Sequence, residues 1–361
     1  MVPEILDCLR GAATFNFLVG GGEDAVFRHS RLCHGFAPFR FGESERDLDR
    51  LESLINCIDQ TKGVDVILPC DTPSILAAIK LGSRIRQNLI PLPSLSDFTV
   101  HNDKWRFRAL CEECGVPTPK TLYFSDKSQI DFTHIKEELG LPFVIKPTNE
   151  EAGRGIMKIA TQEKFEHCLR DNPYYSFAPL IAQEFVHGQD IDLSLLVSHG
   201  GILCHAAQMV TGGVTHFVRA DELLEMGKRV VAHTGFNGVV HFDARFDCRE
   251  GIIKFIESNP RFWGSVAKAK TCGLNFVTAG IALALGEWPF EVQSIEGKQY
   301  QATPAFFLKL LTAQVPLTEL QWATTVEMLS NLSDPVTLFL KKYTRIRERA
   351  KQRQYRDTVW Q

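Results

Sequence analysis

Two carboxylates and an amide lie on a predicted hairpin in the last third of the sequence. The segments Gly238–Phe246 (GVVHFDARF) and Ile252–Arg261 (IIKFIESNPR) follow strand patterns and flank a short turn. Alternate residues of a strand share a face, so Glu257 and Asn259 point the same way, nearly opposite Asp243. Two close carboxylates in a buried sheet repel each other unless a cation lies between them, and oxygen ligands suit Mg²⁺. The pattern predicts either a Mg²⁺ site or an ordinary hairpin with exposed acids.

A lysine inside an apolar run is the second chemical signal. Lys146 stands in FVIKP, which predicts a buried strand. An ammonium group is costly to bury without an anionic partner, and a phosphate would serve. The next segment, Asn149–Gly155 (NEEAGRG), is polar and is expected to be a mobile loop, called the lid loop below. Gly153, Arg154 and Gly155 offer backbone N–H groups and a guanidinium group to phosphate oxygens, although most such loops are plain turns.

A third segment, QEFVHGQD at residues 183–190, leaves a predicted strand over Ile181–Val186. A chain leaving a strand in this way can offer backbone groups to the edge of a purine. Asp190 would then be placed for ribose hydroxyls. Together with the upstream lysine and loop, this segment favours a nucleotide site.

A glycine-rich turn gives a competing interpretation. Gly20–Ala25 (GGGEDA) fits G-x-G-x-x-A after a predicted strand, the fingerprint of dinucleotide sites, and Glu43 and Glu45 follow about 20 residues later. This pattern would make the protein a nicotinamide-dependent oxidoreductase. The alternative is a tight turn near a substrate.

The elements that would position these groups alternate between strands and helices near the N-terminus. The sequence predicts strands over Phe15–Val19 and Val64–Pro69 and helices over Glu45–Gln60 and Ser74–Arg86. Such alternation is typical of an open α/β domain. A helix over Asp103–Cys114 ends at Gly115, and the VPTP that follows is the best linker in the chain. Downstream we expect a hairpin over Leu193–Val197 and Ile202–Met209 and helices over Ser265–Cys272 and Phe276–Leu285.

Composition narrows the class of protein. A chain of 361 residues forms two or three domains and needs no disulfides to bury a core. Its net charge of −3 gives no global positive field, so we expect no nucleic acid as a partner. The ten cysteines are scattered, and the pair Cys111 and Cys114 lies in a helical pattern, which favours reduced thiols. No secretory signal or transmembrane segment is predicted, so we expect a cytoplasmic protein.

The order and spacing of these motifs over roughly residues 1–290 resemble the ATP-grasp superfamily, which includes D-alanine–D-alanine ligase, biotin carboxylase and carbamoyl phosphate synthase. The resemblance implies an α/β protein of the α+β ATP-grasp type. A Rossmann-like pre-ATP-grasp domain would span residues 1–100, and an ATP-grasp domain of two α+β subdomains would span 101–290. Its lid subdomain would cover about 120–186 and its metal-bearing subdomain about 187–290. Residues 291–361 would form a C-terminal helical extension with a basic tail.

The resemblance also implies roles for single residues. The lysines that meet the ATP phosphates would be Lys104 (in HNDKW) and Lys146. The lid over the β- and γ-phosphates would contain Gly153, Arg154 and Gly155. The hinge that binds adenine would be Gln183, Glu184 and Val186, with backbone groups of the last two, and the ribose ligand would be Asp190. The Mg²⁺ ligands would be Asp243, Glu257 and Asn259, with Arg261 beside the reacting phosphate.

The sequence departs from the family pattern in two places. The lid loop carries Glu150 and Glu151 and has fewer glycines than in many relatives. His241 stands where some relatives have an arginine. Both departures concern the detail of the phosphate contacts.

The activity that the resemblance implies is that of an ATP-dependent carboxylate–amine ligase, which uses ATP and Mg²⁺, with Mn²⁺ as an alternative metal. A carboxylase and an acyl-phosphate kinase stay open within the family, and the oxidoreductase stays open outside it. The expected partners are a small-molecule carboxylate and an amine, with a homodimer left open and a basic tail that would touch a polyanion or remain a solvated helix. Candidate substrate residues are His216, Arg219, Trp263 and Ser265, of which the first two fit a solvated loop equally well.

Overall fold

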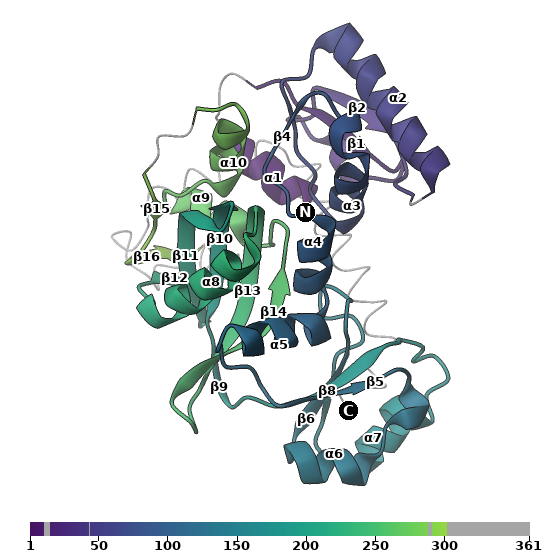
Figure 1. The fold of residues 1–361 in the computed structure, drawn as a ribbon, viewed down its shortest axis with the longest axis vertical. Coiled ribbons are helices and arrows are strands. Elements are labelled where there is room, and N and C mark those ends of the chain that lie inside the picture. Colours follow the sequence, from purple (N-terminus) through teal and green to yellow (C-terminus); the bar gives the residue numbers. More distant parts are fainter. Residues whose placement is uncertain (11–14, 43, 288–290, 302–361) are drawn as a thin grey trace, which may run out of the picture. The chain divides into compact units, whose positions relative to one another are not determined.

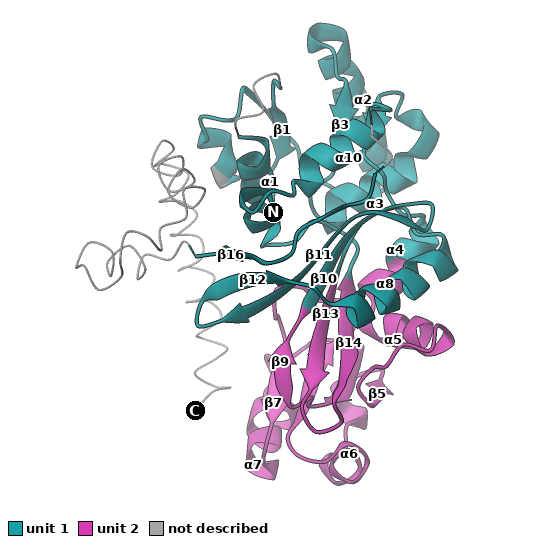
Figure 2. Ribbon diagram, turned by 90° about the vertical axis from the view of Figure 1, so that its left-hand side faces the viewer, with its two compact units in different colours: residues 1–98, 192–241, 259–342 teal, residues 99–191, 242–258, 343–361 magenta. Residues whose placement is uncertain are grey.

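The computed structural model describes residues 1–10, 15–42, 44–287 and 291–301 (Figure 1). Contacts divide these residues into two compact units (Figure 2). Unit 1 takes its described residues from 1–98, 192–241 and 259–301, and unit 2 from 99–191 and 242–258. Each unit is therefore assembled from segments that are distant in the sequence.

The N-terminal part of unit 1 contains short parallel strands and helices. Strand β1 (Leu18–Gly21) pairs with β2 (Gly35–Pro38), and β3 (Val66–Ile67) pairs with β4 (Asn88–Leu89). The helices are α1 (Val2–Leu9), α2 (Glu45–Lys62) and α3 (Thr72–Leu81), and α4 (Leu95–Asn102) leads into unit 2. Helix α2 begins where the sequence predicts, because the Ser44 side chain caps its first turn. The first strand begins at Leu18, three residues later than the sequence predicts.

The turn after β1 does not have the form of a dinucleotide site. In such sites an α-helix begins directly after the glycines, and its N-terminus holds the pyrophosphate. Here the chain passes from Gly22 into a one-turn 3-10 helix, Val26–His29. The competing oxidoreductase interpretation therefore lacks its anion-binding helix.

The sheet of unit 1 is covered by helices that pack against its strands. Strands β10 (Asp192–Ser198), β11 (Gly201–Thr211), β12 (Val214–Val218) and β16 (Lys298–Tyr300) follow in that order, and β15 (Gln293–Ser294) pairs with β11. Helices α9 (Val266–Thr271) and α10 (Phe276–Ala284) pack on the face with Leu196 and Phe217, and α8 (Asp221–Thr234) packs against β10 and β11. The hairpin β10–β11 and helices α9 and α10 were predicted, whereas β12 and α8 were not.

Unit 2 contains a four-stranded antiparallel sheet. Its order is β5 (Thr121–Phe124), β8 (Leu180–Glu184), β6 (Phe143–Pro147) and β7 (Met157–Ile159). Helices α6 (Phe132–Leu139) and α7 (Gln162–Phe165) and a π-helical turn at Glu166–Arg170 complete a core with Phe143 and Phe165 at its centre. The bounds of β6 are those predicted from the sequence.

A helix and a hairpin complete unit 2. Helix α5 (Lys104–Glu113) begins after Asp103, whose carboxylate accepts hydrogen bonds from N–H groups of the first turn. Strands β13 (Gly238–Asp247) and β14 (Ile252–Asn259) form the predicted hairpin, and each has a short end in unit 1. Strand β9 (Gly188–Asp190) pairs with the end of β13.

The C-terminal segment and the length of the helices were also subjects of prediction. The predicted basic tail and most of the predicted helical extension lie outside the described residues, and residues 291–301 contain β15 and β16. Within the described ranges, no helix combines the length and apolar character that crossing a membrane requires.

Candidate nucleotide and metal site

Lys104 connects a predicted metal ligand with the lid loop. It is the first residue of α5, and its side chain is 7% exposed. Its Nζ lies 3.2 Å from Glu257 Oε2 and donates a hydrogen bond to the backbone oxygen of Glu150 at 2.9 Å. The ammonium group is therefore satisfied by one carboxylate and one carbonyl oxygen within unit 2.

Lys146 is buried on β6, as the sequence predicts, and is 3% exposed. Burial lowers its pKa to about 8, because the charged form loses its hydration. The charge of Lys104 acts in the same direction, whereas Glu257 and Asp243 oppose the shift. The charges of Lys104, Glu257 and Asp243 thus lie close enough to Lys146 to shift its pKa.

The three predicted metal ligands come from neighbouring strands. Asp243 is on β13 and Glu257 on β14, which are adjacent in their sheet. Asn259 follows Glu257 by two residues on the same strand and belongs to unit 1, where its Oδ1 accepts a hydrogen bond from Arg261 Nη2 at 2.8 Å. Asp243 and Glu257, two carboxylates of unit 2 that both act on the charge of Lys146, fit a hard cation such as Mg²⁺.

The lid loop joins β6 to β7 and contains no helix or strand. The Arg154 side chain is 62% exposed and pairs with Glu150 at 3.1 Å. Gly153 and Gly155 have φ values of +75° and +71°, in the region that favours glycine. At Gly155 a Cβ would also approach a proline ring carbon to 2.7 Å, and the buried Tyr175 hydroxyl donates to its backbone oxygen at 2.7 Å. The end of the loop is therefore anchored, while Arg154 lies near the surface.

The predicted adenine hinge begins at the end of β8. Gln183 is buried and its Nε2 donates to Thr121 Oγ1 at 3.0 Å, so its side chain supports the four-stranded sheet. Glu184 is the last residue of β8, and its carboxylate lies 3.5 Å from Lys254 Nζ. Val186 has a buried side chain and lies between β8 and β9, outside both strands.

Lys254 is a buried cation that the sequence interpretation missed. Its side chain is 5% exposed, and its Nζ lies 3.1 Å from Asp247 Oδ2 and 2.7 Å from Glu250 Oε1, in addition to Glu184. These three carboxylates lie close enough together to hold a metal, and Lys254 supplies positive charge among them. A lysine inside the apolar run IIKFI is the same signal that identified Lys146, and it could have found this residue.

Arg245 holds the other end of the hinge. Its Nη2 donates to the backbone oxygen of Gly188 at 2.8 Å, and its Nε lies 3.3 Å from Asp190 Oδ1. The guanidinium carbon also lies 5.3 Å from the centre of the Phe185 ring. Lys158 Nζ lies 3.7 Å from the same ring centre. The side chain of Asp190 is 72% exposed, so it is accessible for the ribose contact that the sequence predicts.

Trp263 and Ser265 lie in a polar cluster of unit 1. The Trp263 ring stacks on His241 at 5.3 Å between centroids and 6° between planes, and His241 Nδ1 lies 2.9 Å from Ser194 Oγ. Ser265 Oγ donates to Gln208 Oε1 at 3.0 Å. Sequence reasoning did not connect these polar and aromatic side chains, because they come from three strands and a loop.

The other two candidate substrate residues lie apart from this cluster. On β12, Thr215 Oγ1 accepts a hydrogen bond from Lys268 Nζ of α9 at 2.9 Å, so the adjacent His216 points to the opposite face of the sheet. Arg219 is 74% exposed and pairs with Asp221 at 2.8 Å. The structure thus brings Trp263 and Ser265 into one region and leaves His216 and Arg219 outside it.

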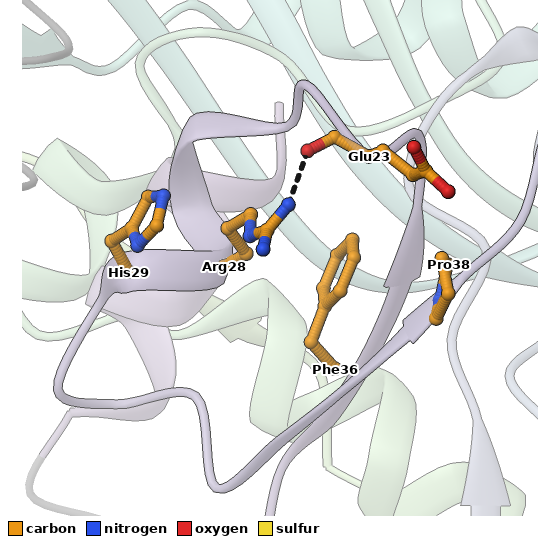
Figure 3. Close-up of a pocket in the computed structure, with 5 residues that line it drawn as sticks. All are labelled: Glu23, Arg28, His29, Phe36 and Pro38. Atoms are coloured by element: carbon orange, nitrogen blue, oxygen red, sulfur yellow. Dashed lines mark hydrogen bonds between the residues drawn. The ribbon is translucent and has the colours of Figure 1, made fainter.

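A hollow of about 580 Å³ lies beside the glycine-rich turn of unit 1 (Figure 3). It is lined by Glu23, Arg28, His29, Phe36 and Pro38. The guanidinium of Arg28 donates to the backbone oxygen of Glu23 at 2.6 Å, and its carbon lies 5.6 Å from the Phe36 ring centre. Its side chains offer both charges and an aromatic ring.

Comparison with known proteins identifies the fold. A family model described as ATP-grasp in the biosynthetic pathway with Ter operon matches residues 176–305. A D-alanine–D-alanine ligase of Oceanobacillus iheyensis is 28% identical over 137 residues, which is 37% of this chain and 37% of that protein. The chain thus matches little more than a third of the length of that curated relative.

Two solved structures have the same fold at low sequence identity. The N5-carboxyaminoimidazole synthetase of Staphylococcus aureus with ADP gives a TM-score of 0.63 at 14% identity, covering 86% of this chain and 83% of that chain. The biotin carboxylase domain of the Hydrogenobacter thermophilus 2-oxoglutarate carboxylase, with MgADP and bicarbonate, gives 0.60 at 16% identity, covering 81% and 68%. Residues 176–305 thus match an ATP-grasp family model, and both solved structures share the fold of this chain.

Proposed function

We propose that the protein is an ATP-dependent ligase that activates a substrate carboxylate as an acyl phosphate and joins it to an amine, with release of ADP and phosphate. The observation that carries the proposal is the pair of buried lysines in unit 2, Lys104 and Lys146, beside two half-buried carboxylates, Asp243 and Glu257. Lysines buried beside carboxylates are suited to a ligand that brings both phosphate groups and a metal. The similarity to a D-alanine–D-alanine ligase supports the same reaction class.

In this proposal the substrate carboxylate attacks the γ-phosphorus of ATP, and ADP leaves with the electrons of the broken bond. The amine then attacks the acyl carbon, phosphate leaves, and the amine loses a proton. Lys104, Lys146 and Arg154 bind the phosphate oxygens and stabilise the charge that develops there. Arg261 lies beside the transferred group. Asp243, Glu257 and Asn259 would hold Mg²⁺, which would neutralise charge on the phosphates.

We also propose how the chain is divided into a Rossmann-like domain, a lid subdomain and a metal-bearing subdomain. The parallel pairs β1–β2 and β3–β4 support a Rossmann-like domain over residues 1–100. The four-stranded sheet with β6 and the lid loop supports a lid subdomain over about 120–186, and the β13–β14 hairpin supports a metal-bearing subdomain over about 187–290. Exposed Asp190 and the chain around Val186 are suited to the ribose and the adenine.

A carboxylase is the second candidate, because the two structural neighbours are named as a carboxylase domain and a carboxyaminoimidazole synthetase. The two reactions differ in the carboxylate that ATP phosphorylates. Bicarbonate would replace the organic acid in the carboxylase.

The test is phosphate release from MgATP with a panel of carboxylates, bicarbonate and amines, followed by trapping with hydroxylamine. A ligase forms a hydroxamate from one carboxylate in the presence of ATP, whereas a carboxylase releases phosphate with bicarbonate and yields no such hydroxamate. The Glu257→Gln variant is the control for catalysis by a contaminant. If the wild type neither binds nor hydrolyses MgATP, the proposal is wrong.

A further inference from the structure

Thr148 carries a buried hydroxyl whose partner is not supplied by the described part of the chain. The residue is 1% exposed, and its Oγ1 makes no hydrogen bond with any described residue. Its backbone groups are both used: the N–H donates to the Pro179 oxygen at 3.2 Å, and the oxygen accepts from the Lys104 N–H at 2.8 Å. Only the side-chain hydroxyl is therefore left over.

The position of Thr148 ties it to the two predicted phosphate lysines. It follows Lys146 by two residues and directly precedes the lid loop. Lys104 donates two hydrogen bonds to this segment. Its backbone N–H donates to the Thr148 oxygen, and its Nζ donates to the Glu150 oxygen. The hydroxyl thus belongs to the stretch of chain that Lys104 holds in place.

A hydroxyl group buried without a hydrogen bond is unfavourable, and a valine of nearly the same shape would avoid the loss. The hydroxyl is therefore best explained by a partner that binds from outside the chain. An anion fits, because the two nearby lysines are cationic and a hydroxyl group can donate to a phosphate oxygen.

We propose that Thr148 Oγ1 donates a hydrogen bond to a phosphate oxygen of the bound nucleotide, and is a nucleotide-binding residue in addition to Lys104 and Lys146. The inference rests on the proposed function, since it takes ATP as the ligand. The proposed hydrogen bond involves the phosphate chain alone and does not depend on the adenine hinge.

The experiment compares the wild type with Thr148→Val, which removes the hydroxyl, and Thr148→Ser, which retains it. Dissociation constants are measured by calorimetry for MgATP and for Mg-tripolyphosphate, and melting temperatures are measured without ligand. We expect Thr148→Val to weaken both ligands about tenfold or more, which corresponds to about 1.4 kcal/mol. We expect its ligand-free melting temperature to be equal or higher, because no unsatisfied hydroxyl remains. Thr148→Ser should bind both ligands within about twofold of the wild type.

Two results would overturn the inference while the proposed function stands. One is wild-type affinity for MgATP in Thr148→Val. The other is a lower ligand-free melting temperature of Thr148→Val together with a loss of ligand affinity in Thr148→Ser as large as in Thr148→Val. That result would mean that the Thr148 side chain serves packing. If the wild type itself binds neither MgATP nor Mg-tripolyphosphate, the proposed function fails, and this inference fails with it.

Discussion

The buried Lys146 ammonium should make the stability of the metal-free protein depend on pH in an unusual direction. The pKa of Lys146 is lowered by burial from 10.5 to about 8. Between these values the unfolded chain binds more protons than the folded chain, so the free energy of unfolding rises with pH across this window. The full difference of roughly 2.5 pH units is worth about 3 kcal/mol, because each unit is worth about 1.4 kcal/mol.

The measurable part of this effect lies between pH 7 and pH 9. Below pH 8 both states carry the charge and the burial penalty is nearly complete. With the two pKa values above, unfolding of the wild type should become less favourable by about 1 kcal/mol from pH 7 to pH 9. Lys146→Met removes the titrating group, so its unfolding free energy should not show this rise between pH 7 and pH 9.

Urea denaturation in EDTA at pH 7, 8 and 9 tests this expectation. The quantity compared is the difference in unfolding free energy between wild type and Lys146→Met, in which the titration of the cysteines cancels. Lys136→Met, which changes an exposed lysine of α6, is the matched control and should follow the wild type. A difference that stays constant from pH 7 to pH 9 would refute the argument that Lys146 is charged and buried.

Three further predictions concern the acids and the lid. Lys254→Met should destabilise the fold by about 3–5 kcal/mol in urea, because buried Asp247 then keeps its charge without a cation; a loss under 1 kcal/mol would contradict this. Trypsin should cleave after exposed Arg154 in the free protein, and an ATP analogue with Mg²⁺ should protect that bond; equal cleavage would disprove lid closure. Glu257→Gln should lower turnover about 10²-fold or more, whereas Glu137→Gln on exposed α6 should not.

Local pattern predicted those elements whose signal is contained in a few consecutive residues. Strand β6 was located to the residue because an apolar run ends at a polar loop, and the β13–β14 hairpin was recognised by its alternation. The sequence predicts no strand at β12 and leaves His216 open between a substrate contact and a solvated loop, whereas in the structure Thr215 beside it is buried and accepts a hydrogen bond from Lys268 of α9. Such tertiary partners cannot be seen in a local window.

The same limit applies to the candidate site. Buried Lys146 could be predicted, because an ammonium group in an apolar run stands out in the sequence. The contact between Lys254 and Glu184 could not, since Glu184 lies 70 residues away in the chain and meets Lys254 only after β8 and β14 have formed. Gln183 was expected at the nucleotide, yet its side chain is taken by Thr121 on the neighbouring strand.

The ion pair between Lys104 and Glu257 has a consequence for the order in which ligands bind. A cation that takes Glu257 deprives Lys104 of its carboxylate, and a phosphate that takes Lys104 deprives Glu257 of its ammonium group. Each ligand alone leaves one partly buried charge without its partner, which is unfavourable. When both bind, the released lysine faces phosphate and the released carboxylate faces metal. In the proposed function, where Lys104 binds phosphate and Glu257 binds the metal, the pair would therefore make binding cooperative: the metal should raise the affinity for ATP, and ATP should raise the affinity for the metal by the same factor.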